Sequence, residues 1–443
     1  MKQLLLLLAA LPAVASAQDR PVALTHVRLI DGTGATPVED ATVVFRDGRI
    51  VAAGADVAAP AGARVLDRRG DSILPGLISN HSHVGQVQGT TAGAENYTRP
   101  IIAAELAQYR RYGVTTVTAL GNNGPLFDPL RADAHAGRLQ ADLFGVDQGI
   151  GVPQGAPPVK VAVDQLFRPA TPAEARAAVD RMAAEHTDLV KIWVDDFYGS
   201  LPVKMDPAIV RAVVAQSHAR GLRVAAHIHD LADARMVVDA GVDILAHGIR
   251  DQLVPTDFAA TLKARGIWYI ATLQLDEATV AWAEQAPWTR TPFARAALSP
   301  ELARQIDDPV WQAKNRAGKQ ANDARASLAI NLANLKTLYE AGVRIGFGTD
   351  SGATPVRVPG VAEHRELALT VQAGLTPMQA IVLATRDAAA MLKLTDRGTI
   401  APGQRADLLV VRGDPSRDIA AADDLVETWE NGTAVAGPLT KGE

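Results

Sequence analysis

Eight short apolar runs alternate with amphipathic stretches through the middle of this chain, and this alternation constrains the fold more than any other feature. Each run has the length of a buried strand, and the stretches between them have helical periodicity. The runs are 73–80, 114–119, 142–146, 189–194, 223–226, 243–246, 268–272 and 344–347. This order predicts an α/β fold, a (β/α)8 barrel of the TIM type.

A doubly wound open sheet is the alternative, because it has the same alternation of strands and helices. That fold usually carries a Gly-rich phosphate-binding turn after its first strand. Here the run 73–80 continues into His81-Ser82-His83, without such a turn. The barrel is therefore the favoured prediction.

The two ends of the chain differ from the middle. Segments 22–51 and 398–435 have the pattern of short strands joined by turns, and they contain the hairpin dipeptides Asp47-Gly48 and Asn431-Gly432. We predict a small β-sandwich domain built from both termini. Residues 18–72 would form its N-terminal part, residues 73–394 the barrel, and residues 395–443 its C-terminal part.

Residues 1–17 have the composition of a signal peptide. Lys2 gives a positive start, Leu4 to Leu8 begin an apolar run, and Ala15-Ser16-Ala17 is a small-residue cleavage site. The apolar run is too short to span a bilayer. We expect a periplasmic or secreted protein without a membrane anchor, since the chain has no Cys for lipid attachment and no later long apolar segment.

Charge and composition narrow the partners. The formal net charge is -5 and no basic cluster stands out, which argues against nucleic acid. A small-molecule substrate is expected, and a homo-oligomer is compatible with the sequence. Because Cys is absent, any metal site would be built from His, carboxylate and Lys-derived oxygen.

Metal-binding residue types follow the predicted strands. His81 and His83 follow the first run, His227 and His247 follow the fifth and sixth, and Asp350 follows the last. In a barrel the carboxyl ends of all strands share one face, where active sites are built. Residues two apart in an extended chain point to the same side, so His81 and His83 can grip one ion.

Lys191 lies within the apolar run 189–194, where an unpaired ammonium would be costly. One interpretation is a buried ion pair with Asp195 or Asp196. The other is a lysine carbamylated by carbon dioxide, which becomes a carboxylate that bridges two metal ions. The position of Lys191 in order between His83 and His227 favours the second interpretation.

The ordered set resembles the metal-dependent amidohydrolase superfamily. The residues that carry the resemblance span almost the whole chain after the signal segment. They are Pro75-Gly76-Leu77-Ile78-x-x-His81-x-His83, Lys191, His227, Ala246-His247-Gly248 and Gly348-Thr349-Asp350-Ser351-Gly352, with Leu29-Ile30-Asp31-Gly32 and Gly403-Gln404-Arg405-Ala406-Asp407-Leu408 at the ends. The sequence of these segments is most similar to the prolidase-like group, which includes Xaa-Pro dipeptidases and ochratoxin-type amidases.

The resemblance implies two divalent ions, with Zn the best match and Mn or Co acceptable. His81, His83 and Asp350 would hold the more buried ion, His227 and His247 the second, and carbamylated Lys191 would bridge both. A hydroxide between the ions would attack the scissile carbonyl, with Asp350 as general base. Ser79 stands where relatives often carry Asp, which would alter support of the site rather than ligation.

Four residues are candidates for substrate contact. Arg250 could pair with a carboxylate, or alternatively form a salt bridge with Asp251. His229 could be a contact or a structural histidine, and Tyr97 and Tyr198 lie in loops that could line the pocket.

Three functional hypotheses remain open. The first is hydrolysis of an amide in an N-acyl amino acid or dipeptide-like substrate. The second keeps the metal centre but acts on a cyclic imide, carbamate or lactone. The third, a non-catalytic binding homologue, is disfavoured because all six metal positions are present. The long connection 273–317, rich in Trp and Pro, is either a lid or specificity segment or a surface helical hairpin.

Overall fold

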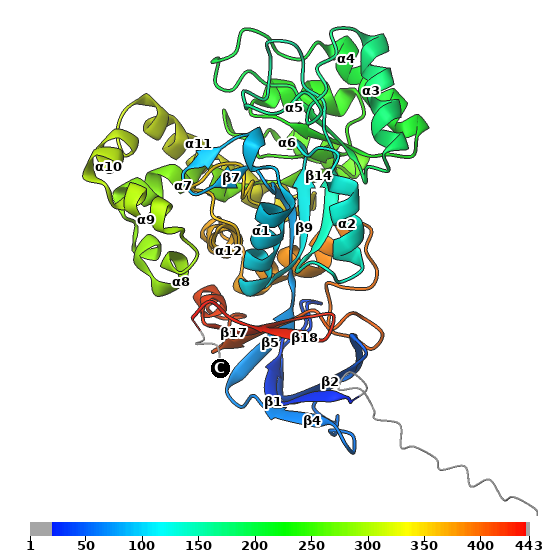
Figure 1. Cartoon of the computed structure of the whole chain (residues 1–443), viewed down its shortest axis with the longest axis vertical. Coiled ribbons are helices and arrows are strands. Elements are labelled where there is room, and N and C mark those ends of the chain that lie inside the picture. Colours follow the sequence, from blue (N-terminus) through cyan, green and yellow to red (C-terminus); the bar gives the residue numbers. More distant parts are fainter. Residues whose placement is uncertain (1–19, 440–443) are drawn as a thin grey trace, which may run out of the picture.

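The computed structural model describes residues 20–439, so the predicted signal peptide 1–17 lies outside the described residues. The chain has a mixed α/β fold in which a β-rich region formed by both ends lies below the α/β body (Figure 1). Among the described residues, no helix is both long and apolar enough to cross a membrane.

Strands from both ends of the chain pair in one sheet. Its order is β18-β17-β16-β5-β1-β2-β3, with β4 paired to β1. The strands are β1 (Val22–Leu29), β2 (Val38–Arg46), β3 (Arg49–Gly54), β4 (Arg64–Asp67), β5 (Asp71–Pro75), β16 (Leu408–Arg412), β17 (Leu425–Glu430) and β18 (Thr433–Ala436). The pairing of β16 with β5 joins segments more than 300 residues apart, and β5 in turn pairs with β1.

The α/β body contains two parallel sheets. One has the order β10-β9-β6 and the other β11-β12-β13-β14-β15. The strands are β6 (Leu77–Ser82), β9 (Val114–Leu120), β10 (Asp142–Val146), β11 (Val190–Trp193), β12 (Val224–His227), β13 (Ile244–Leu245), β14 (Trp268–Ile270) and β15 (Arg344–Gly346). Seven of the eight predicted runs match one of these strands to within a few residues, and the first does not.

The predicted strand 73–80 is wrong as a single element, because it divides at Gly76. β5 before this glycine belongs to the terminal sheet, whereas β6 after it belongs to a parallel sheet. A Cβ at Gly76 would lie 2.2 Å from Oγ1 of Thr115, and the Gly76 N–H donates to the Asp407 carbonyl at 2.8 Å. Only glycine therefore allows the chain to pass this closely between the two sheets.

Backbone hydrogen bonds connect the edges of the two parallel sheets. At one side the Asn80 N–H, in β6, donates to the Phe347 carbonyl just after β15, at 2.6 Å. At the other, the Ile150 N–H donates to the Lys191 carbonyl of β11 at 2.8 Å. Parallel bridges pair Ser82 with Ser351 and Ile150 with Ile192.

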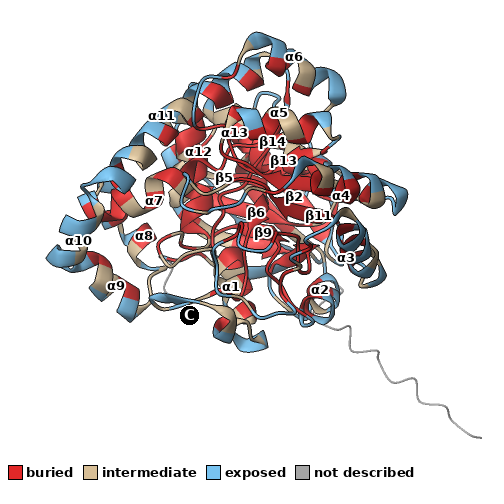
Figure 2. Cartoon of the chain, turned by 90° about the horizontal axis from the view of Figure 1, so that it is seen from above, coloured by how far each residue is buried: buried red, intermediate tan, exposed pale blue. Residues whose placement is uncertain are grey.

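Helices follow most of the parallel strands. They are α1 (Arg99–Arg111), α2 (Phe127–His135), α3 (Pro172–Ala184), α4 (Pro207–Ala219), α5 (Leu231–Asp239), α6 (Thr256–Arg265), α11 (Lys319–Glu340), α12 (Val361–Gln372), α13 (Pro377–Val382) and α14 (Ala388–Met391). Seen from above, buried residues fill the centre around β6, β9, β11 and β14, and the surrounding helices carry the exposed faces (Figure 2). Short elements complete this set: β7 (Val87–Gln88), β8 (Thr91–Ala92), η2 (Ala94–Asn96), η4 (Leu383–Asp387) and η5 (Ile419–Asp423).

The connection 273–317 consists of short helices. They are α7 (Leu273–Glu284), η3 (Pro287–Arg290), α8 (Pro292–Arg295), α9 (Pro300–Asp307) and α10 (Pro309–Asn315). Thr291, Ser299 and Asp308 cap α8, α9 and α10 by accepting backbone N–H groups, and each cap is followed by Pro at the first helical position. These caps and prolines explain why a loop of this length is ordered.

Candidate functional site

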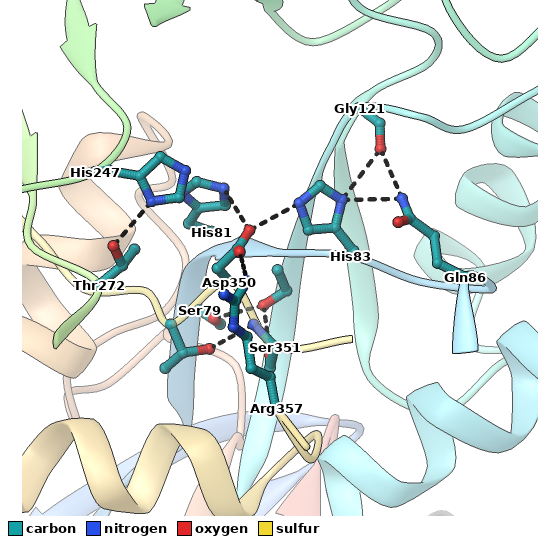
Figure 3. A network of polar contacts seen from close by, with 12 residues as sticks. Ser79, His81, His83, Gln86, Gly121, His247, Thr272, Asp350, Ser351 and Arg357 are labelled. Carbon is teal, nitrogen blue, oxygen red and sulfur yellow. Dashed lines mark hydrogen bonds and ion pairs between the residues drawn. The ribbon is translucent and has the colours of Figure 1, made fainter. Parts of the chain in front are cut away.

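The six predicted metal-binding residues come together at the carboxyl ends of the parallel strands. His81 lies in β6 and His83 directly follows it, Lys191 lies in β11, and His227 ends β12. All six are buried, and Figure 3 shows His247 and Asp350 converging on His81 and His83, which lie on one stretch of chain.

The first group consists of His81, His83 and Asp350, whose ligand atoms all lie within 4.8 Å of one another. Oδ1 of Asp350 lies 3.0 Å from Nε2 of His83 and 3.3 Å from Nε2 of His81. Asp350 has a positive φ of 61°, an uncommon conformation for a residue with a side chain. The surrounding structure holds this strained backbone, as at many active sites.

The second group consists of His227 and His247, whose ring centroids are 4.2 Å apart. The ring of His247 also lies 4.4 Å from that of His81, so the two groups are contiguous. Phe197 stacks on His227 at 4.9 Å with an interplanar angle of 12°, and Asp195 lies 3.3 Å from Nε2 of His227. The four imidazoles therefore form one buried cluster.

Lys191 is fully buried beside this cluster, and no described group lies within hydrogen-bond distance of its Nζ. The expected alternative, an ion pair with Asp195 or Asp196, is wrong. Asp195 instead engages His227, and Asp196 lies 3.7 Å from Lys204. Burial lowers the pKa of Lys191 to about 7, although Asp350 and Asp195 oppose this shift.

Two histidines are oriented by contacts from their second ring nitrogen. Nδ1 of His247 lies 2.9 Å from Oγ1 of Thr272, and Nδ1 of His83 lies 3.3 Å from the Gly121 carbonyl (Figure 3). Such contacts fix the ring and leave Nε2 directed at the cluster. Gln86 also contacts Nδ1 of His83, at 3.1 Å.

Burial and charge set the protonation of the site. Burial lowers the pKa of His81 and of His247 well below the ordinary value, so both imidazoles are neutral and able to bind a metal. Burial would raise the pKa of Asp350, but Arg357 and the nearby imidazoles of His81 and His83 outweigh it and hold this pKa well below its usual range. Asp350 is therefore ionised at neutral pH.

These residues fit divalent metal ions. Both ring nitrogens of His81 and Nζ of Lys191 are buried without a hydrogen-bond partner in the described structure. Unpaired buried polar atoms are costly, and neutral imidazoles with a carboxylate are the donors that Zn, Mn or Co accept. The donor set thus explains atoms that would otherwise be unsatisfied.

A buried carboxylate that the sequence pattern did not reveal supports the site. Oε1 of Glu363, in α12, accepts hydrogen bonds from Ser79 at 3.2 Å and from Thr349 and Ser351 at 2.7 Å each. These hydroxyls flank His81 and Asp350, so one side chain ties the end of β6 to the segment after β15. Its only sequence signal was an acidic residue on the apolar face of a helix.

A pocket of about 200 Å³ opens onto the cluster. Its lining includes His83, His227, Asp350, Tyr198 and Arg357. Tyr198 therefore lies where the sequence predicted. The described residues that line this pocket do not include Tyr97, whose ring packs beside Gly85 and Gly124.

Arg250 borders the pocket, but its charge is already engaged. Its Nη1 lies 3.0 Å from Oδ1 of Asp276, and both side chains are almost fully buried. The expected alternative partner, Asp251, is wrong, since that carboxylate accepts the Leu231 N–H at 2.9 Å. The sequence did not identify Asp276 as a partner because it lies in α7, 26 residues further along the chain.

His229 and Arg357 complete the polar surroundings. Nδ1 of His229 lies 2.6 Å from Asp230, its Nε2 is buried without a partner among the described residues, and its ring packs 4.3 Å from that of Tyr198. Arg357 donates to Oδ2 of Asp350. The sequence pattern did not single out Arg357, because it follows Asp350 in an irregular loop without strand or helix periodicity.

Known proteins resemble this chain over nearly its full length. The profile of the amidohydrolase family matches residues 72–443. Imidazolonepropionase of Deinococcus deserti is 24% identical over 414 residues, covering 90% of this chain and 93% of that protein. A candidate prolidase from Bifidobacterium longum superposes with a TM-score of 0.74 at 25% identity, covering 95% of this chain and 96% of that one.

The ochratoxinase of A. niger has the same fold, with a TM-score of 0.71 at 19% identity over 96% of this chain and 97% of that one. The match to the family profile covers the parallel strands and every residue of the buried cluster. The chain belongs to the amidohydrolase family of metal-dependent hydrolases, which act on carbon–nitrogen bonds.

Proposed function

We propose that this chain is a binuclear amidohydrolase that cleaves an amide bond in an N-acyl amino acid or a dipeptide-like substrate. The observation that carries the proposal is the buried cluster itself. Nζ of Lys191 and both ring nitrogens of His81 make no hydrogen bond with the described residues, although they lie beside three further imidazoles and Asp350. Two ions and a carbamate on Lys191 would satisfy Nζ of Lys191 and one ring nitrogen of His81.

The ligand assignment follows the two groups. His81, His83 and Asp350 would hold one ion, and His227 and His247 the other, with carbamylated Lys191 between them. We propose Zn as the metal, with Mn or Co as substitutes, because the donors are nitrogen and oxygen without thiolate. Bound ions supply an activated water and polarise the scissile carbonyl.

The side chains of this protein transfer the protons and position the base. Asp350 is ionised and accepts the proton of the attacking water on a carboxylate oxygen, then delivers it to the leaving nitrogen. Water adds its oxygen to the carbonyl carbon, the carbon–nitrogen bond breaks, and a carboxylate and an amine leave. Arg357 holds Oδ2 of Asp350, which leaves Oδ1 facing His81 and His83.

We also propose that the two parallel sheets form one closed (β/α)8 barrel and that the terminal strands form a β-sandwich domain. Hydrogen bonds from Asn80 and Ile150 support closure, since they join the sheet edges on both sides. The proposal also includes a signal peptide at 1–17 and the domain bounds 18–72, 73–394 and 395–443. We further propose a periplasmic or secreted location and a small-molecule substrate.

A second candidate keeps the metal centre and opens a ring, such as a cyclic imide, or acts on a carbamate or lactone. Imidazolonepropionase, the relative described above, is named for a ring substrate, and this supports the alternative. One screen separates the two candidates. N-acyl amino acids, Xaa-Pro dipeptides, cyclic imides and lactones are each assayed with added Zn, and the class with the largest kcat/KM identifies the bond.

Metal content tests the binuclear centre. Purified protein should hold close to two transition-metal equivalents per chain by mass spectrometry of the metals, and Lys191→Ala should lose metal and activity. Acetate should restore part of both in Lys191→Ala, because it can occupy the position of the carbamate, whereas chloride at equal ionic strength should not. Full activity in metal-free wild-type protein would refute the proposal.

A further inference from the structure

A second and larger cavity adjoins the pocket at the metal cluster. Its volume is about 560 Å³, against about 200 Å³ for the pocket. Four residues line both spaces, namely Phe197, Tyr198, Leu275 and Arg357. The two spaces therefore share a wall of side chains, which we call the neck, and the larger space is called the outer chamber.

The neck is a fixed feature of the fold. Phe197 and Tyr198 have positive φ values of 50° and 61°, so two successive side-chain-bearing residues adopt a strained backbone conformation. The ring of Phe197 stacks on His227, and the ring of Tyr198 packs against His229. Both rings are therefore held by the residues that form the inner site, while Tyr198 remains 48% exposed.

The outer chamber is built by the segment whose role the sequence left open. α7, α10 and α11 lie together at one side of the molecule (Figure 1), and residues of all three line the chamber. The lining mixes apolar and polar side chains. Its apolar part is formed by Leu275, Val280, Ala321 and Ala324, whereas Lys314, Lys319 and Gln320 are exposed and lie at its rim. Both carboxylates of the lining are paired, Asp276 with Arg250 and Asp323 with Lys319.

From this arrangement we propose that the substrate carries an extended apolar group, acyl or aryl, which passes the neck and occupies the outer chamber. This rests on the proposed function, since the scissile amide must lie at the metal cluster. The inner pocket alone is smaller than most ligand pockets, whereas the two spaces together reach the size of a site for a drug-sized molecule. Small apolar side chains along the wall leave room for such a group, and the 273–317 segment, which supplies α7 and α10 to the chamber, is thus a specificity segment.

Two substrate series test the proposal. In N-acylglycines the acyl chain grows from acetyl to decanoyl, and in N-acetyl amino acids the apolar side chain grows instead. Lengthening the group that enters the chamber should raise kcat/KM by about threefold for each added methylene until the chamber is filled. A gain in one series identifies the side of the amide that faces the chamber, and a gain in neither series overturns the proposal.

A pair of variants on α11 links this preference to the chamber. Ala324→Trp fills the chamber and should lower the ratio of kcat/KM for the longest to that for the shortest substrate by about tenfold or more. Ala326→Trp is the matched control, because Ala326 is exposed on the same helix and does not line the chamber. An unchanged ratio in Ala324→Trp, with the fold intact by circular dichroism, would also overturn the proposal.

Binding separates this inference from the proposed function. N-alkylglycines and N-ethyl amino acids are the counterparts of the two series with the amide carbonyl reduced to methylene. They carry no scissile amide, and calorimetric titration measures their affinity for wild-type protein without turnover. Affinity that rises with chain length in wild type but not in Ala324→Trp supports occupation of the outer chamber by the apolar group, even if no amide is hydrolysed. Hydrolysis of short amides together with affinity independent of chain length would reject the chamber and leave the proposed function standing.

Discussion

Arg357 donates to Oδ2 of Asp350, while the other oxygen of that carboxylate lies 3.0 Å from Nε2 of His83. One carboxylate thus faces the metal cluster with one oxygen and a guanidinium with the other. This arrangement limits the rotation of Asp350 and keeps its charge. It makes Arg357 a positioning residue for the proposed base.

The first prediction concerns this pair. Arg357→Gln removes the guanidinium that lowers the pKa of Asp350, so this pKa should rise and the acid limb of kcat/KM should move to higher pH. We expect kcat/KM at neutral pH to fall by about ten- to a hundredfold, since misplacing a reacting group has effects of this size. Arg304→Gln, on the exposed face of α9, is the control and should behave as wild type. An unshifted acid limb would contradict the positioning role.

The second prediction concerns Thr272, which contacts Nδ1 of His247. Thr272→Val keeps the shape and removes the hydroxyl, so the ring loses the contact that orients it. Affinity for the second metal ion should fall by about 10- to 100-fold, measured by competition with a chelator. Thr261→Val removes an exposed hydroxyl bonded to its own helix and should leave metal affinity unchanged. Equal affinities in both variants would show that Thr272 does not orient His247.

The third prediction concerns the close approach of Gly348, which follows β15, to His81 in β6. A Cβ at Gly348 would lie 2.6 Å from the backbone nitrogen of His81 and 2.7 Å from its Cβ. Gly348→Ala must therefore displace His81, and we expect a loss of about 1–3 kcal/mol in unfolding free energy together with loss of one metal equivalent. Denaturant titration and metal analysis measure the two effects. Retention of full metal content would show that His81 can move without leaving the site.

The fourth prediction concerns Glu366 in α12, which accepts the N–H groups of Leu273 and Gln274 at the start of α7. Burial raises the pKa of Glu366 to about 8, whereas in the unfolded chain it titrates near its ordinary value. Between about pH 5 and pH 8 the unfolded state therefore binds fewer protons, and the contribution of this group to stability decreases as pH rises.

Glu366→Gln cannot ionise, so its stability relative to wild type should improve from pH 5 to pH 8. We expect a relative gain of at least about 1 kcal/mol, measured as the shift between urea midpoints. Glu340→Gln, an exposed residue at the end of α11, should show no such dependence. A pH-independent difference between wild type and Glu366→Gln would indicate that Glu366 is ionised in the folded protein.

The sequence predicted most of the secondary structure because its signals are local. The period of apolar residues predicted the strand 142–146 with the bounds that the structure has. It also predicted that His81, His83, Lys191, His227, His247 and Asp350 would meet, since parallel strands bring their carboxyl ends to one edge. The position of each residue relative to the predicted strands was sufficient to predict that the six would meet.

Other features depended on contacts between distant segments. The division of 73–80 at Gly76 depends on Thr115 and Asp407, and the engagement of Arg250 depends on Asp276 in a separate helix. Glu363 reaches Ser79 across 284 residues of chain. No local period encodes such partners, because burial and hydrogen bonding at these positions arise only once the sheets and helices pack.

The sequence by itself thus determined which residues gather at the strand ends, because strand direction and side-chain alternation are fixed by local backbone geometry. Tertiary packing alone decided which charges remained unpaired there. Lys191 has no hydrogen-bond partner among the described residues because Asp195 is held by His227, and Arg250 is engaged because α7 brings Asp276 beside it. The same packing of α7 against α11 shapes the outer chamber, which lies between segments that the sequence places far apart.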